Sequence, residues 1–89
     1  KYANQETNNI NFYAIKNERN NQIDLYWAIP PKATGLVKLY RSINNAPFRL
    51  MITLNSQIQH YADNDIKAGQ LYRYKILCQD ISKEITILY

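Results

Sequence analysis

The stretch YADNDIKAGQLYRYKILC, which runs from Tyr61 to Cys78, decides the fold of this chain. It predicts a strand that ends near Asp63, a tight crossing that contains Gly69, and a long strand whose alternate residues are apolar. A glycine followed shortly by a tyrosine at the start of such a strand indicates a tyrosine corner. In that motif a buried Tyr hydroxyl bonds to the backbone a few residues upstream. Tyr72 occupies the position, so the stretch predicts a β-sandwich.

Short segments with period-two alternation make up the rest of the chain, and none has a helical period. The predicted strands are Asn11–Lys16, Gln22–Ala28, Leu36–Ser42, Phe48–Leu54, Gln57–Asp63, Gln70–Asp80 and Lys83–Leu88. In the fourth strand we expect Phe48, Leu50, Ile52 and Leu54 to share one face. The fifth is ambiguous, because Ile58 cannot share a face with Tyr61 without a bulge. The pattern predicts an all-β, seven-stranded antiparallel sandwich of the immunoglobulin-like kind.

Length and composition limit what the chain can be. Its 89 residues, 46% of them apolar and 20% charged, allow one folded domain with one core. One cysteine excludes an internal disulfide. The net charge is +4, but the basic residues are scattered and form no stripe, so we expect no nucleic-acid binding. No stretch approaches the roughly 18 apolar residues of a membrane helix, so we expect no membrane insertion.

The first nine residues are polar and without periodicity, which predicts a linker or disordered segment at 1–9 followed by a domain at 10–89. The chain begins at Lys1 rather than Met, which favours an excised or processed fragment. Asn, Ile, Lys and Tyr are abundant, a bias that is associated with AT-rich bacteria.

From about Ile10 to Leu88 these segments resemble a bacterial-type fibronectin type III domain. The resemblance rests on Trp27, on Val37–Ser42 with Phe48 and Leu50–Ile52, on Tyr61–Asp63 with Ile66 and Gly69, and on Tyr72 with Tyr74, Ile76, Cys78 and Asp80. The chain departs from the family pattern at Val37, where many members have Tyr, and at Cys78, where a small apolar residue is usual. Ile81–Lys83 replaces the usual small-residue turn, so the register of the last strand stays open.

The resemblance implies a non-catalytic module, without cofactors, of a larger bacterial secreted or cell-surface protein. We expect it to act as a spacer and protein-interaction domain, monomeric, with neighbouring domains or another protein as partners. The alternative is an accessory glycan- or cell-wall-binding domain of a secreted polysaccharide-degrading enzyme. The phosphate-loop, dinucleotide, zinc-protease and nucleophile-elbow motifs are all missing from the sequence, which also disfavours an enzyme.

Four candidate sites have simpler structural interpretations. His60, the single histidine, lacks a motif around it and is expected to pack at a strand surface. Cys78 falls on an apolar phase, which favours a buried small residue over a reactive thiol. Asp63–Asp65 offers oxygen ligands for Ca²⁺, but Asx-turn hydrogen bonds explain it without a metal, so we expect no metal site. The rings of Tyr2, Tyr13 and Tyr26 are candidates for sugar stacking, although cross-strand packing is the commoner role.

One set of residues supports a positive hypothesis about binding. If the third, fourth and sixth strands lie side by side, cations, an aromatic ring and apolar groups gather on their outward face. This predicted interaction face consists of Lys38, Tyr40, Arg49, Met51, Arg73, Lys75 and Leu77. The predicted structural core consists of Trp27, Leu25, Leu39, Tyr72 and Ile76.

Overall fold

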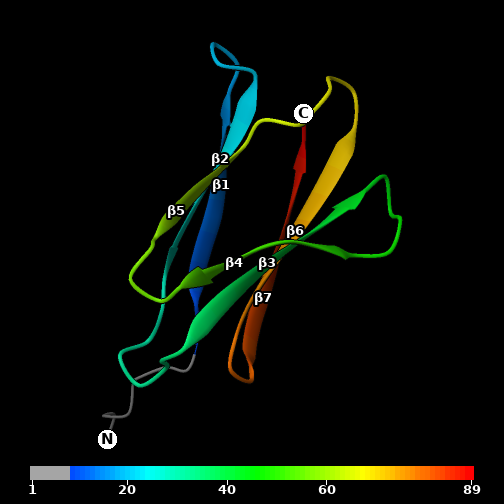
Figure 1. The fold of residues 1–89 in the computed structure, drawn as a ribbon. Helices are drawn as coiled ribbons and strands as arrows, with labels where there is room; N and C mark the ends of the chain where they lie inside the picture. The colour runs from blue at the N-terminus through cyan, green and yellow to red at the C-terminus, as the bar shows by residue number, and fades with distance from the viewer. Residues whose placement is uncertain (1–8) are drawn as a thin grey trace, which may run out of the picture.

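A computed structural model describes residues 9–89, and seven strands make up its regular structure (Figure 1). They are β1 (Asn11–Asn17), β2 (Gln22–Ala28), β3 (Leu36–Ile43), β4 (Arg49–Asn55), β5 (His60–Asp63), β6 (Leu71–Cys78) and β7 (Ile81–Leu88). The predicted polar segment at 1–9 lies outside the described residues except for Asn9, and so does Tyr2. Within the described part of the chain, no helix has the length and apolar character to cross a bilayer.

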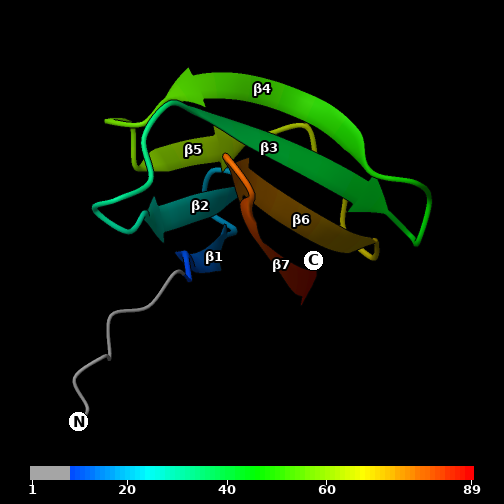
Figure 2. The same ribbon diagram turned by 90° about the horizontal axis from the view of Figure 1, so that it is seen from below.

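The strands form two antiparallel sheets, which Figure 2 shows as two layers. One sheet has three strands in the order β1-β2-β5, and the other has four in the order β4-β3-β6-β7. Consecutive strands thus change sheet between β2 and β3, between β4 and β5, and between β5 and β6. The predicted all-β sandwich is confirmed.

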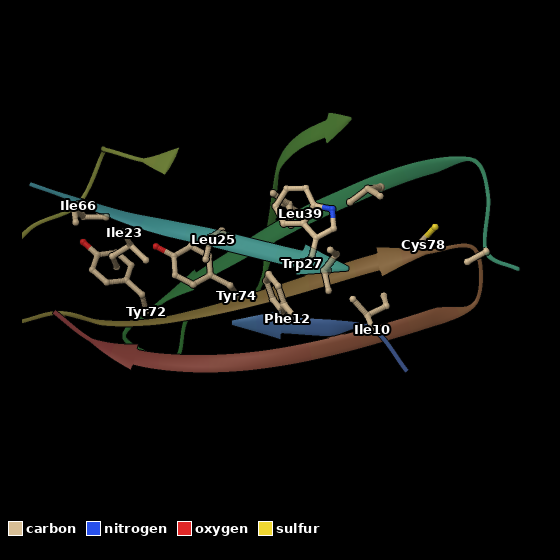
Figure 3. Packing of buried hydrophobic residues seen from close by; sticks show 13 residues of the cluster. Ile10, Phe12, Ile23, Leu25, Trp27, Leu39, Ile66, Tyr72, Tyr74 and Cys78 are labelled. Carbon is tan, nitrogen blue, oxygen red and sulfur yellow. The ribbon is translucent and has the colours of Figure 1, made fainter. Parts of the chain in front are cut away.

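The core lies between the two sheets and is built from the inward phase of their strands. Trp27 of β2 is paired with Phe12 of β1, and both belong to the same buried cluster as Leu39 of β3 (Figure 3). The full set of buried apolar residues is Ile10, Phe12, Ile23, Leu25, Trp27, Ala33, Val37, Leu39, Ile66, Tyr72, Tyr74, Ile76 and Cys78. All five residues of the predicted structural core are among them.

The crossing from β5 to β6 has the predicted tyrosine corner. The Tyr72 ring is fully buried, and its hydroxyl accepts a hydrogen bond from the backbone N–H of Lys67 at 2.7 Å. The same hydroxyl donates to the side-chain oxygen of Gln70 at 2.8 Å. Gly69 has a φ of +86°, a conformation that side chains disfavour, and this lets the chain turn into β6. The Tyr72 hydroxyl therefore bonds to residues on both sides of Gly69 and holds the connection between the two sheets in place.

Asparagine replaces glycine in two of the other turns. Asn21 ends the β1–β2 turn at a φ of 54°, and Asn44 and Asn45 adopt 51° and 68° between β3 and β4. Asn tolerates this left-handed region better than other non-glycine residues. Gln79 takes it at 57° in the β6–β7 turn, which sets the register of β7 with Cys78 opposite Ile81.

The expectation that Phe48, Leu50, Ile52 and Leu54 share one face is wrong. In the β3–β4 ladder Leu39 lies opposite Ile52, but the next residue, Tyr40, lies opposite Leu50. Met51 is therefore an extra residue in a β-bulge, which reverses the phase of the strand. As a result Ile52 and Leu54 are partly buried against the core, whereas Leu50 is 53% exposed on the outer face.

The remaining boundaries differ from prediction by a few residues. β5 is shorter than Gln57–Asp63, because Ile58 lies outside the ladder and is 41% exposed. The strand needs no bulge, and Tyr61 opposite Leu25 and Asp63 opposite Ile23 share its inward phase. β7 starts two residues earlier than predicted, at Ile81, because the turn before it contains only Gln79 and Asp80.

Candidate functional site

The outer face of the four-stranded sheet gathers cations and rings at its centre. Across the strands, Leu50, Tyr40, Lys75 and Glu84 lie opposite one another in a single row. Lys38 and Leu77 form the neighbouring pair on one side. We call this surface the cationic face, and it consists of Lys38, Tyr40, Phe48, Leu50, Arg73, Lys75 and Leu77.

Two aromatic rings, Tyr40 and Phe48, contact two of the three cations of this face. The Lys75 ammonium lies 5.2 Å from the ring centres of both Tyr40 and Phe48. The Arg73 guanidinium lies 5.0 Å from the Phe48 ring, and one of its nitrogens is 3.1 Å from a Glu84 oxygen. Each such contact over an exposed ring stabilises by about 0.5–1 kcal/mol. The rings therefore limit the rotamers that both cations adopt.

The structure changes the membership of the predicted interaction face. Lys38, Tyr40, Arg73, Lys75 and Leu77 lie together on it, as their registers require. Arg49 and Met51 do not, because the bulge places Met51 out of register and Arg49 opposite the inward-phase Arg41. Phe48 and Leu50 take their places. The sequence contains the signal for neither change, since a bulge has no fixed residue signature.

Arg49 and Met51 line a groove at the edge of the sandwich instead. It has a volume of about 580 Å³ and lies between β4 and the β5 edge of the other sheet. Its other lining residues are Arg41, Ile43, Ala46, Pro47, Leu50, Tyr61, Asp63 and Asp65.

A charged network that sequence reasoning missed ties the two sheets together at this groove. Nη1 of Arg41 donates to both carboxylate oxygens of Asp63 at 2.9 Å, and the Tyr74 hydroxyl donates to the same carboxylate at 2.7 Å. The Arg41 and Asp63 side chains are only 18% and 5% exposed. The signal was present: Arg41 continues the inward phase of Val37 and Leu39, and a charge at such a position requires a partner.

The network shifts the pKa values of its members away from their ordinary ranges. Burial acts first on Tyr74, and its hydrogen bond to the Asp63 carboxylate adds to this, so the pKa of the phenol is raised. Burial opposes the charge of Arg41, but the bond to Asp63 outweighs it and raises the pKa of the guanidinium. Both residues thus keep their protons at neutral pH, and we interpret the network as structural rather than as a proton carrier.

On the opposite outer face, three rings stand side by side across the three-stranded sheet. Tyr13 of β1 stacks on Tyr26 of β2 at 5.4 Å between ring centres, and Tyr26 stacks on His60 of β5 at 4.7 Å. We call these residues the ring row. Its two ends are exposed, because β1 and β5 are edge strands, and Tyr13 is 49% exposed. His60 and Tyr26 thus have the packing role expected for them, and sugar stacking remains a proposal.

Asp24 beside the ring row is buried, although it lies between the inward-facing Ile23 and Leu25 on the outward phase of β2. His60 Nε2 lies 3.2 Å from one carboxylate oxygen, and the side-chain amides of Gln22 and Asn17 donate to the carboxylate at 2.8 and 3.2 Å. Burial opposes ionisation of Asp24, but these hydrogen bonds outweigh it and lower the pKa of the carboxyl below its ordinary 3.8. The ionised form is therefore the one that the fold favours.

A lowered folded-state pKa predicts how Asp24 contributes to acid unfolding. Its stabilising effect is present above the ordinary pKa and is lost as the pH falls through the lowered value. At about pH 6 we expect Asp24→Asn to destabilise the domain, because the substitution removes an ionised carboxylate. At about pH 3 the same substitution should destabilise it less. Urea midpoints of parent and variant at both pH values measure this. A constant difference between the two would show that Asp24 does not titrate with folding.

The other two candidate sites, Cys78 and Asp63–Asp65, form local structural contacts. The Cys78 thiol is buried 3.7 Å from the Thr34 carbonyl oxygen, and burial raises its pKa, as expected of an inert thiol. The Asp63 carboxylate accepts the backbone N–H of Asp65 at 3.2 Å, which is the predicted Asx turn. Within residues 9–89, no three His, Cys, Asp or Glu side chains come together as metal ligands would.

Comparisons with known proteins extend these observations. No family model matches the chain. Over 54 residues, or 61% of its length, the chain is 32% identical to human usherin, of which this match covers 1%. Among solved structures it is similar to a Fn3-like protein from Clostridium thermocellum, with a TM-score of 0.66 and 20% identity over 88% of this chain and 86% of that one.

Two pectate lyases contain a similar domain. The likeness to PelI of Erwinia chrysanthemi, solved with tetragalacturonic acid, has a TM-score of 0.75 at 14% identity. The likeness to Pel3 of Pectobacterium carotovorum has a TM-score of 0.76 at 16% identity. These matches cover 88% and 91% of this chain but only 28% and 27% of the lyases. The strand order, the tyrosine corner and these likenesses agree that the chain has a fibronectin type III-like fold.

Proposed function

We propose that the chain is a non-catalytic module of a larger bacterial cell-surface or secreted protein, in which it acts as a spacer and protein-interaction domain. The observation that carries the proposal is the path of the chain. The described chain enters at one end of the long axis and leaves near the other, and the molecule measures 46 × 25 × 25 Å (Figure 1). A domain connected in this way separates its neighbours by its own length.

The likenesses support the same proposal. Usherin and both pectate lyases are much longer than the part that this chain matches, so a similar sequence in the first and similar folds in the lyases occur inside larger proteins. The cationic face is centred on β3 and β6, the two inner strands of the four-stranded sheet (Figure 1). That position suits contact with another protein.

Small-angle X-ray scattering from two copies joined end to end tests the spacer role. The maximum dimension of the pair should exceed that of one copy by about one long axis, or 46 Å. A pair that packs side by side, with a maximum dimension close to that of one copy, would contradict a spacer.

A second candidate, an accessory glycan- or cell-wall-binding domain of a secreted polysaccharide-degrading enzyme, is favoured by two observations. PelI is a pectate lyase that was solved with tetragalacturonic acid, and the ring row offers two exposed ring ends flanked by the polar Asp24 and Gln22. Pull-down on polygalacturonate and on insoluble glycans tests it. Tyr26→Ala removes the middle of the ring row, whereas Tyr40→Ala changes the opposite face, so retention lost only in Tyr26→Ala would support glycan binding.

A further inference from the structure

The cationic face has more positive charge than its own acids can neutralise. Glu84 is its acidic neighbour and is already bonded to Arg73 at 3.1 Å. Lys38 and Lys75 form no ion pair with any residue between 9 and 89. Both lysines project from central strands of the sheet rather than from its edges, where lysines commonly serve to prevent strand pairing. No carboxylate of residues 9–89 therefore neutralises either charge.

Lys75 is held in a conformation that suits binding. Its ammonium lies 5.2 Å from the centres of both the Tyr40 and Phe48 rings, so two contacts already restrict the four-carbon side chain before a ligand arrives. Ordering a flexible side chain is one of the main entropic costs of forming an interface. A ring leaves the hydrogen-bond donors of the ammonium free, because it attracts the cation without accepting all of its N–H groups. The Lys75 donors can therefore bond to a carboxylate.

The apolar residues beside the cations decide what kind of anion fits. Leu50 is 53% exposed next to Tyr40 in the same row, and Leu77 lies opposite Lys38. A uniformly charged polymer would bury the leucines against polar groups, whereas a protein segment can present carboxylates and apolar side chains in one surface. We infer that the cationic face binds an acidic segment of a partner protein, in which Glu or Asp pairs with Lys75 and Lys38 and an apolar side chain covers Leu50.

This inference rests on the proposed function and adds the kind of partner that the domain would bind. A spacer could still be correct if the face bound nothing, because the scattering experiment above does not depend on the face. The two proposals can therefore fail separately.

The test measures binding of three probes to the intact chain by isothermal titration calorimetry at low salt. The probes are a random copolymer of Glu and Tyr, poly-L-glutamate, and polygalacturonate. The copolymer should bind most tightly, because it alone offers carboxylates together with apolar groups in a polypeptide. Its affinity should fall steeply between about 0.05 and 0.5 M salt as exposed charges are screened.

Matched variants separate this face from general charge attraction. Lys38→Gln with Lys75→Gln removes two charges from the face, and Lys16→Gln with Lys67→Gln removes two exposed charges elsewhere. Both pairs lower the net charge of +4 by the same amount. The first pair should weaken copolymer binding by about tenfold or more, and the second by less than about twofold. Phe48→Leu keeps every charge but removes one ring, and it should weaken binding by about two- to fivefold.

Three outcomes would overturn the inference. Tightest binding to polygalacturonate would assign the face to an acidic polysaccharide. Equal losses in the two lysine pairs would reduce the effect to net charge. The acidic partner would be ruled out if the unsubstituted chain, shown by circular dichroism to be folded, did not bind the copolymer measurably.

Discussion

Replacing Trp27 with alanine should lower the free energy of unfolding by about 3–5 kcal/mol, a loss that comes from the cavity left in the core. Trp27 is buried in the middle of the sandwich beside Phe12 and Leu39, so the truncated side chain leaves a cavity that both sheets border (Figure 3). Small domains have a total stability of about 5–15 kcal/mol, so the loss is a large fraction of the whole. Urea denaturation followed by circular dichroism measures it.

Tyr26→Ala is the matched control, because Tyr26 is the adjacent residue of β2 on the outer face. Its loss should cost about 1 kcal/mol or less, the range for cross-strand ring pairs. If the two variants were equally stable, or if Trp27→Ala melted within a few degrees of the parent, Trp27 would not be the centre of the core.

Asp63→Ala should destabilise the domain by about 3–5 kcal/mol, because it leaves a partly buried cation without its buried carboxylate partner and with only the exposed Asp65 nearby. Arg41 loses two charge-assisted hydrogen bonds at 2.9 Å, and the buried Tyr74 hydroxyl loses its acceptor at 2.7 Å. The carboxylate belongs to β5 and both partners to the other sheet, so the substitution also removes a link between the layers. Thermal and urea unfolding of the variant measure the effect.

Asp65→Ala provides the control two residues away. Its side chain is 88% exposed and lies 3.6 Å from Arg41, so its loss should cost less than about 1 kcal/mol. The double variant Asp63→Ala with Arg41→Met adds a second check, because it removes the orphaned charge and should recover part of the stability. A double variant no more stable than Asp63→Ala would mean that the unpaired Arg41 is not what destabilises it.

The tyrosine corner and most of the core were predictable because they depend on local signals. Alternation places Leu25, Trp27, Tyr72 and Ile76 on inward phases, and a strand with clear alternation has only one way to bury its apolar side. Gly69 adds a turn with a specific backbone requirement. Such signals lie within a few residues of one another and do not depend on which strands become neighbours.

The reversed phase of β4 was not predictable in this way. A bulge at Met51 changes which residues face the core. Leu50, Met51 and Ile52 are consecutive and all apolar, so alternation does not show which of them points inward. The consequence for the candidate site is direct, because Phe48 and Leu50 rather than Arg49 and Met51 join the cationic face.

The charged network depended on long-range pairing. Arg41 and Asp63 are 22 residues apart and lie in different sheets, so their contact follows only from the packing of the layers. Burial of Asp24 likewise required His60 to be placed beside it by the β2–β5 ladder. The sequence can indicate that a buried charge needs a polar partner, but only the packing of the strands shows which residue that partner is.

Nuclear magnetic resonance mapping of the bound copolymer shows which outer face of the sandwich binds an acidic partner. Amide shifts of the parent chain would be followed during titration with the random copolymer of Glu and Tyr at low salt. We expect the perturbed residues to cluster around Tyr40, Leu50 and Lys75 on the four-stranded sheet. Perturbations centred on Tyr13, Tyr26 and His60 would contradict binding at the cationic face, because they would place the copolymer on the ring row of the opposite sheet.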